Sequence, residues 1–293
     1  METFIITIFD GLALGSIYAL IALGYTMVYG IAKMLNFAHG DVIMVGAYTA
    51  FTCVISLNFP PLVAVIMCIA VCVILGIAIE FLAYRPLRQA PSLSVLITAI
   101  GVSYFLQNVS QMFFGTEQKT FPTDFVEISP IVIGNISISG VTIFTLLTTG
   151  ILMIALTLFI SKTKLGKAMR ATSEDRQAAE FMGISVNKTI TWTFAIGSLL
   201  AAIASIFFGI TYPKITPTIG SMPGIKAFTA AVFGGIGSIP GAMLGGILLG
   251  IIEKLASAYI SNKLSNSIVF GVLILVLVIK PTGLLGKTIK EKV

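Results

Sequence analysis

Apolar residues in this chain fall into long unbroken runs that short polar segments separate. A membrane-spanning helix needs about 20 apolar residues, because each residue rises about 1.5 Å through a hydrocarbon core of about 30 Å. Continuous rather than alternating runs predict helices rather than strands. The expected fold is therefore all-α, a polytopic helical membrane protein with about eight spans. The predicted spans cover about residues 11–30, 42–57, 62–83, 93–114, 141–160, 190–212, 242–259 and 267–279.

One apolar stretch, residues 225–233, is too short to cross a bilayer alone. It ends at the Gly-rich break 234–241 (GGIGSIPG), after which the helix over 242–259 is expected. Two arrangements remain open: a helical hairpin with a tight turn at the inner surface, or a re-entrant half-helix that dips into the bilayer and returns. Irregular backbone at membrane depth is tolerated only where protein buries it or where it lines a cavity. The re-entrant arrangement would therefore place the break on a translocation path.

Composition and charge support a membrane location. The chain is 57% hydrophobic and 10% charged, whereas soluble domains carry about 25% charged residues. Thirteen of the 18 Lys and Arg residues lie at position 33 and in segments 85–88, 162–188 and 280–292, which the predicted spans place on one side. The positive-inside rule makes that side cytoplasmic, with the N-terminus outside and the C-terminus inside. The net charge of +6 is thus explained by orientation, and no nucleic-acid partner is expected.

The longest charged segment, residues 162–188, holds six basic and three acidic residues. We call it the coupling segment. Its sequence predicts a short surface helix from Ser173 to Met182, with Thr172 as the N-cap and Asp175 at the third helical position, where an acid supports the cap. Gly183 follows at a position where helices often end. Small residues on one face of such a helix would let another protein surface approach closely.

The coupling segment resembles the cytoplasmic loop by which permeases of ATP-binding-cassette (ABC) transporters dock on their ATPase subunits. The short form of that motif is Glu-Ala-Ala, three residues, Gly. Here Gln177 replaces the glutamate, so a docking contact at this position cannot depend on a carboxylate. The residues that the resemblance assigns to ATPase coupling are Arg170, Asp175, Gln177, Ala178, Ala179 and Gly183.

Longer stretches resemble the branched-chain amino acid (Liv-type) permease family, and most closely its H-type subunit. They cover residues 14–30 (LGSIYALIALGYTMVYG), 36–41 (NFAHGD), 46–48 (GAY), 170–176 (RATSEDR), 234–238 (GGIGS) and 241–242 (GA). The resemblance extends over essentially the whole chain, so residues 1–293 are expected to form a single permease domain that includes the coupling segment.

The resemblance implies a bacterial inner-membrane importer with several subunits. This chain and an M-type permease would form the path, two cytoplasmic ATPases would drive alternating access, and an extracytoplasmic binding protein would deliver Leu, Ile or Val. Permeases for urea and short-chain amides share many of these sequence motifs and remain an alternative. A self-sufficient secondary transporter is a third, and the single histidine and the few intramembrane acids argue against it.

Polar residues near the predicted spans are the candidates for the translocation path. Asn36, His39 and Gly40 lie after the first span, where they can join two helices, line the path or, with Asp41, relay protons. An amino-acid carboxylate needs hydrogen-bond donors such as a half-helix N-terminus. The residues that could supply them near the break are Thr229, Gly234, Gly235, Gly237 and Ser238.

No catalytic, cofactor or metal site is expected from the sequence. Residues 283–288 (GLLGKT) contain part of a phosphate-binding loop, but Pro281 stands where its first glycine should be. The three cysteines lie within predicted spans without further ligands to join them, so they are expected to be small packing residues. ATP hydrolysis would belong to partner subunits.

Overall fold

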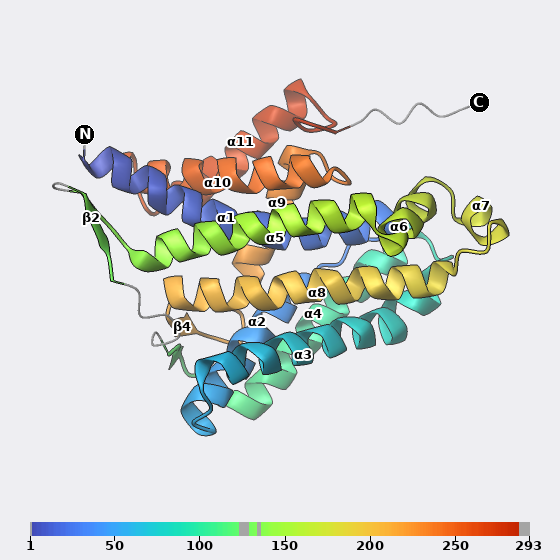
Figure 1. Ribbon diagram of the computed structural model, residues 1–293, viewed down its shortest axis with the longest axis horizontal. Coiled ribbons are helices and arrows are strands. Elements are labelled where there is room, and N and C mark those ends of the chain that lie inside the picture. Colours follow the sequence, from blue (N-terminus) through green and yellow to red (C-terminus); the bar gives the residue numbers. More distant parts are fainter. Residues whose placement is uncertain (1, 123–128, 134–135, 287–293) are drawn as a thin grey trace. The chain divides into compact units, whose positions relative to one another are not determined.

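The computed structural model describes residues 2–122, 129–133 and 136–286, and helices make up most of it (Figure 1). Asp124, Glu127 and the basic residues of 287–293 lie outside the described residues, as does the end of the 283–288 segment. The elements, in chain order, are α1 (Glu2–Ala32), α2 (His39–Phe51), the π-helix η1 (Thr52–Ser56), α3 (Pro61–Ile79), the π-helix η2 (Glu80–Tyr84), the 3-10 helix η3 (Arg85–Leu87), α4 (Ser92–Phe114), β1 (Lys119–Thr120), β2 (Ile131–Ile133), β3 (Ile136–Ile138), α5 (Gly140–Lys162), α6 (Lys164–Glu174), α7 (Arg176–Phe181), α8 (Val186–Thr211), β4 (Lys214–Ile215), α9 (Ser221–Gly234), α10 (Ile239–Tyr259) and α11 (Ser265–Ile279).

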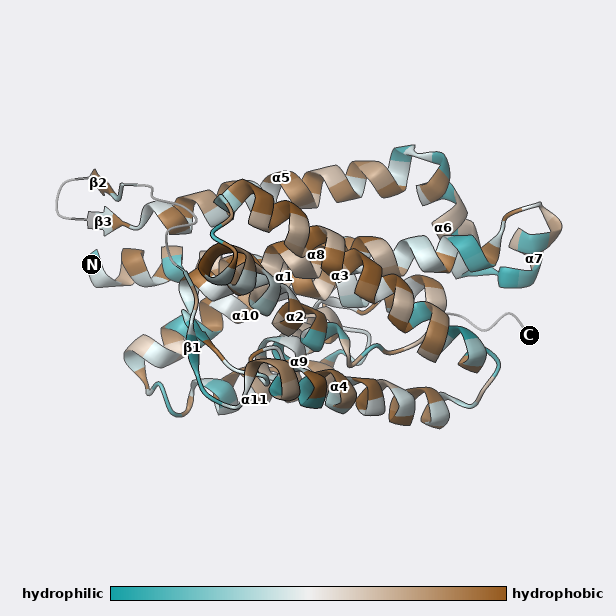
Figure 2. Ribbon diagram, turned by 90° about the horizontal axis from the view of Figure 1, so that it is seen from below, coloured by the Kyte–Doolittle hydropathy of each residue, from teal (hydrophilic) through white to brown (hydrophobic). Residues whose placement is uncertain are grey.

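The expected all-α membrane fold is confirmed. Within the described residues, six helices are long and apolar enough to cross a membrane, and α11 is a shorter apolar helix. Hydropathy colouring shows predominantly apolar helices, with hydrophilic residues gathered on α6 and α7 (Figure 2). The predicted second span is the 13-residue α2 continued by η1, and the third is α3 continued by η2. A π-turn at the end of each helix carries it through one more turn.

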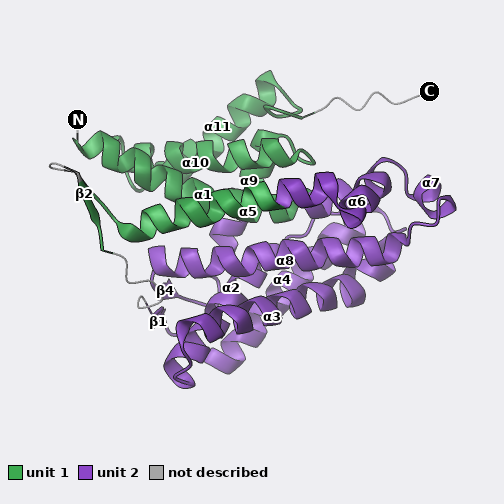
Figure 3. Ribbon diagram, viewed as in Figure 1, with its two compact units in different colours: residues 1–26, 127–155, 226–293 green, residues 27–126, 156–225 purple. Residues whose placement is uncertain are grey.

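The chain divides into two compact units (Figure 3): residues 1–26, 127–155 and 226–293 form unit 1, and residues 27–126 and 156–225 form unit 2. In unit 1, α1 packs against α10 through glycines. A Cβ on Gly15 would lie 2.6 Å from the carbonyl oxygen of Ile247, and a Cβ on Gly11 would lie 2.9 Å from the Cα of Ile251. Only glycine permits this approach of two helix backbones, which is how membrane helices pack tightly.

Unit 2 is centred on α2, α3 and α8, which contact one another extensively. Small residues make these contacts close: a Cβ on Gly46 would meet Ser205, and one on Gly76 would meet Ser198. Cys68 lies among them, and its thiol donates to the carbonyl oxygen of Gly46 at 3.4 Å. The three cysteines are buried and form no disulfide with one another.

Helices α9 and α10 form a hairpin with one short and one full-length arm. Helix α9 has 14 residues, which at about 1.5 Å per residue is about 21 Å, well short of a bilayer core. It begins at Ser221, earlier than the sequence predicts, because Pro223 falls in its first turn, where proline is tolerated. Helix α10 is long enough to span, so the hairpin is neither two full helices nor two half-helices.

The turn between α9 and α10 is joined to the residues that follow α11. The amide of Leu284 donates to the carbonyl oxygen of Phe233, and that of Leu285 to Gly234, both at 2.9 Å. The turn therefore lies at the same end of unit 1 as the end of α11.

Candidate coupling surface and intramembrane polar clusters

The coupling segment folds into two helices rather than the one that the sequence predicts. Helix α6 ends at Glu174, and Asp175 then adopts an extended backbone (φ −151°, ψ 118°). The carboxylate of Asp175 accepts from the amides of Gln177 and Ala178 at 2.8 and 3.0 Å, so it is the N-cap of α7. The predicted helix from Ser173 to Met182 is therefore wrong, because Asp175 interrupts the segment and Thr172 is buried within α6 instead of capping it.

The end of α7 lies where the sequence predicts it. Gly183 has a φ of +79°, a left-handed conformation that glycine adopts without steric cost. The amide of Gly183 donates to the carbonyl oxygen of Glu180 at 2.9 Å, and that of Ile184 to Ala179 at 2.9 Å. These bonds satisfy carbonyls that the end of a helix would otherwise leave open.

The exposed face of α7 is more apolar than the sequence motif indicates. Ala179 is buried, while Gln177 and Ala178 are exposed. Phe181 and Met182 are 90% and 82% exposed. An apolar pair this exposed at the end of a polar helix is typical of a surface that another protein covers. Phe181 was missed because it is one of the three positions that the docking motif leaves unspecified.

Two arginines attach the coupling segment to the rest of unit 2. Arg170 donates from Nη2 to the carbonyl oxygen of Ser161 at 3.1 Å, which holds α6 against the end of α5. Arg176 donates from Nη2 to the carbonyl oxygen of Ala32, the last residue of α1. This bond joins the start of α7 to the end of α1.

Asn36, His39 and Gly40 lie together at the junction between α1 and α2. The hydroxyl of Tyr84 donates to Oδ1 of Asn36 at 3.0 Å. A Cβ on Gly40 would lie 2.5 Å from the carbonyl oxygen of Gly220, so the junction packs directly on the chain before α9. His39 is buried. This geometry gives Asn36 and Gly40 a packing role, and whether the three residues also line the path stays a prediction.

A polar cluster that sequence reasoning missed follows this junction. Asp41 is buried at the start of α2, and its Oδ1 accepts from Nε2 of Gln107 at 2.9 Å. The same Nε2 lies 3.3 Å from Oγ of Ser221, the first residue of α9. The cluster therefore connects the start of the short helix α9 to α2 and α4.

Backbone conformation and close packing explain the glycines of the α9–α10 break. Gly235 and Gly237 have φ values of +110° and +90°, and Gly234 packs on the backbone of Gly241. Ser238 caps α10, since its hydroxyl accepts from the amide of Gly241 at 3.3 Å. Thr229 is buried within α9.

A buried ion pair in unit 1 was also missed. Lys226 of α9 donates to Oε1 of Glu253 of α10 at 2.6 Å. The hydroxyl of Tyr18 in α1 donates to Oε2 at 3.0 Å, and the lysine ammonium lies 5.8 Å from the centre of the Tyr18 ring. The two charged side chains are only 9% and 11% exposed. Isolated charges in apolar runs are the available signal for such a pair, but the sequence does not tell which charges meet.

A second ionic network lies at the end of α3. The guanidinium of Arg88 contacts Oε1 of Glu80 through Nη2 and donates through Nη1 to Oδ1 of Asn187. Thr191 of α8 donates to Oε2 of Glu80 at 2.8 Å. Glu80 opens the π-turn η2 and is fully buried, so the π-turn places a satisfied charge between α3 and α8.

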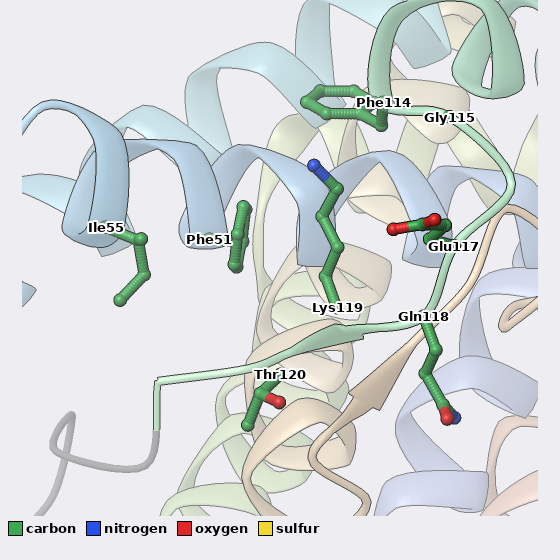
Figure 4. Close-up of a pocket in the computed structure, with 8 residues that line it drawn as sticks. All are labelled: Phe51, Ile55, Phe114, Gly115, Glu117, Gln118, Lys119 and Thr120. Carbon is green, nitrogen blue, oxygen red and sulfur yellow. The ribbon is translucent and has the colours of Figure 1, made fainter.

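At the other end of α4, a cavity of about 480 Å³ opens between α2 and the segment 115–120 (Figure 4). Phe51, Phe114 and Lys119 line it, and the ammonium of Lys119 lies 5.5 and 5.9 Å from the two ring centres. Short strands fix this segment, because Lys119 pairs with Ile215 and Thr120 with Lys214. In the part of the chain that the structure describes, no three His, Cys, Asp or Glu side chains converge as metal ligands would.

Apolar spanning helices, intramembrane ion pairs and one protruding polar segment define the class: a multi-pass helical membrane protein. The sequence profile of the family described as "Branched-chain amino acid transport system / permease component" matches residues 7–278. The chain belongs to this family, which confirms the resemblance found in the sequence.

Named relatives cover nearly the whole chain. It is 46% identical to the high-affinity branched-chain amino acid transport system permease protein BraD of Pseudomonas aeruginosa, over 97% of this chain and 96% of that protein. It is 45% identical to LivH of Escherichia coli K12, a protein of the same description, over 99% and 98%. A probable LivH of Methanocaldococcus jannaschii is 30% identical over 92% and 89%.

Proposed function

We propose that this protein is a permease subunit of an ABC importer that carries branched-chain amino acids into the cytoplasm. The observation that carries the proposal is the near-complete coverage of two relatives described as high-affinity branched-chain amino acid permeases. The protein itself is not expected to be an enzyme, since hydrolysis of ATP belongs to partner subunits. Residues 1–293 act as one permease domain in this proposal.

The partners follow from the same proposal. A second, M-type permease completes the translocation path, two ATPase subunits bind on the cytoplasmic side, and an extracytoplasmic protein delivers Leu, Ile or Val. The charge distribution supports a cytoplasmic C-terminus and an extracytoplasmic N-terminus, because most basic residues fall on the side of the coupling segment.

The ATPase contact is proposed at α7. Its exposed residues Gln177, Ala178, Phe181 and Met182 are the contact surface, while Gly183 ends the helix and Asp175 begins it. Ala179 supports the helix from the buried side instead of touching the partner. Movement of the ATPases on ATP binding would reach α1 through the bond from Arg176 to Ala32.

The translocation path is proposed to include the α1–α2 junction and the α9–α10 hairpin, that is Asn36, His39, Gly40, Thr229, Gly234, Gly235, Gly237 and Ser238. The short helix α9 supports this part of the proposal, since a helix that begins at depth exposes backbone amides to a path. Its amides suit the carboxylate of an amino acid.

The experiment is affinity purification of the tagged protein from its native membrane, followed by reconstitution of the recovered complex in proteoliposomes with ATP inside. We expect a second permease and an ATPase to co-purify, and leucine uptake that isoleucine and valine inhibit. Uptake inhibited by urea but not by isoleucine would assign the protein to the urea and amide permeases. Gradient-driven uptake by this chain alone would contradict the ABC proposal.

A further inference from the structure

A second cavity, of about 430 Å³, lies in unit 2 where the end of α1 meets the connection between α3 and α4. Three basic residues line it: Lys33 just after α1, Arg88 between α3 and α4, and Arg176 at the start of α7. Its lining includes no acidic residue. A concave site with several cations and no facing carboxylate is suited to an anion.

The positive charge of this cavity is only partly compensated by the protein. Glu80 neutralises Arg88 through Nη2, but Nε of Arg88 is buried and has no hydrogen-bond partner among the described residues. Arg176 donates to a neutral carbonyl oxygen, that of Ala32. Burial lowers the pKa of Arg176, and the nearby Arg88 lowers it further. A bound anion would relieve the repulsion between these guanidinium groups.

The start of helix α4 adds partial positive charge to the cavity. Helix α4 begins at Ser92, on the cavity wall, with no side-chain cap. The amides at the start of a 23-residue helix carry partial positive charge.

The remaining wall is apolar. Tyr29, Val95 and Leu96 line it, from the last turn of α1 and the first turns of α4. The cavity thus lies at the ends of two helices that are long and apolar enough to cross a membrane. A free anion would make no favourable contact with these apolar side chains. A phospholipid carries an acyl chain next to its phosphate and could contact both parts of the cavity.

We propose that this cavity binds the phosphate group of an anionic phospholipid, with Lys33, Arg88 and Arg176 around the phosphate and the acyl chain along Tyr29, Val95 and Leu96. Because Arg176 is also the first residue of α7, the lipid would hold the start of the proposed coupling helix. That consequence rests on the proposed function; the binding itself does not.

The test measures lipid retention by native mass spectrometry and thermal unfolding of the purified full-length protein. Phosphatidylglycerol, phosphatidylcholine and inorganic phosphate are titrated separately. We expect saturable stabilisation by phosphatidylglycerol alone, and at least a tenfold weaker apparent affinity for the double variant Lys33→Gln/Arg176→Gln. The matched control is Lys188→Gln, which removes an exposed cation that does not line the cavity and should bind like the wild type.

Several outcomes would overturn the proposal. Equal binding of phosphatidylcholine would remove the role of charge, and equal binding of inorganic phosphate would make this a free-anion site. An effect of Lys188→Gln as large as that of the double variant would make the attraction non-specific. Loss of the retained lipid when the complete importer assembles would assign the cavity to acidic side chains of a partner. Each of these results can arise whether or not leucine transport is found.

Discussion

The ion pair between Lys226 and Glu253 allows the most quantitative prediction. The proposed perturbation is a pair of single variants and their combination: Lys226→Met, Glu253→Gln and the double variant. Gln keeps an oxygen that can accept from the Tyr18 hydroxyl, which lies 3.0 Å from Glu253 in the native protein. The cycle therefore removes the charges and leaves the neighbouring hydrogen bond available.

The expected loss of unfolding free energy follows from the distance between the two charges and from their burial. At 2.6 Å, and with an effective dielectric constant of about 20, the attraction is roughly 6 kcal/mol. Desolvation costs several kcal/mol for each ion, so the two contributions nearly cancel. Removing one partner leaves the other charge buried at 9% or 11% exposure. We therefore expect each single variant to lose about 3–5 kcal/mol of unfolding free energy, and the double variant to lose less than either.

The assay is reversible unfolding in mixed micelles of mild detergent and dodecyl sulfate, followed by far-ultraviolet circular dichroism. Lys263→Met, at an exposed position of the same unit, is the control and should stay within about 0.5 kcal/mol of the wild type. Single variants as stable as this control, or a double variant whose loss equals the sum of the single losses, would refute a coupled buried pair.

Further predictions concern packing and the coupling segment. Gly15→Leu should prevent α1 from reaching α10 and strongly destabilise unit 1, whereas Gly101→Leu, where a Cβ would meet no atom within 4 Å, should leave the thermal midpoint nearly unchanged. Asp175→Ala should lower the stability of α7 by about 1 kcal/mol through loss of its cap, measured as faster amide hydrogen exchange at Gln177 and Ala178; unchanged exchange would exclude the cap. Gly183→Arg should leave the protein in the membrane but abolish ATP-driven uptake, and normal uptake would count against docking at α7. Phe181→Ser should reduce co-purification of the ATPase by at least tenfold, since exposed aromatic anchors dominate interfaces; full recovery of the ATPase would place the interface elsewhere.

Local sequence was sufficient to predict the long helices. Their apolar runs match the thickness of a bilayer, and a helix makes all its backbone hydrogen bonds within one segment. Local sequence also identified Gly183 as the end of the coupling helix, since a left-handed residue there favours glycine. The prediction from local sequence was wrong at Asp175, where one helix ends and the next begins. The carboxylate of Asp175 can support a cap from the third helical position or be the cap itself, and only the backbone conformation distinguishes the two roles.

The candidate site likewise has features that the sequence predicts and features that depend on packing. The coupling segment was recognisable as a contiguous motif, whereas the exposure of Phe181 and the burial of Ala179 depend on how α7 packs. Glu80, Lys226 and Glu253 were visible as charges in apolar surroundings, but their partners come from other helices. Residues 27 apart in the Lys226–Glu253 pair and 111 apart in the Thr191–Glu80 bond meet only in the folded chain.

The sequence by itself thus determined the class of protein, the approximate positions of its long apolar helices, and the charged segment between two of them. Hydrophobic run length and charge are properties of consecutive residues, so folding does not alter them. The tertiary structure decided which charges neutralise one another, how closely α1 and α10 approach, and where basic residues 33, 88 and 176 surround one cavity. These depend on side chains from distant segments meeting within a few ångströms, which consecutive residues do not encode.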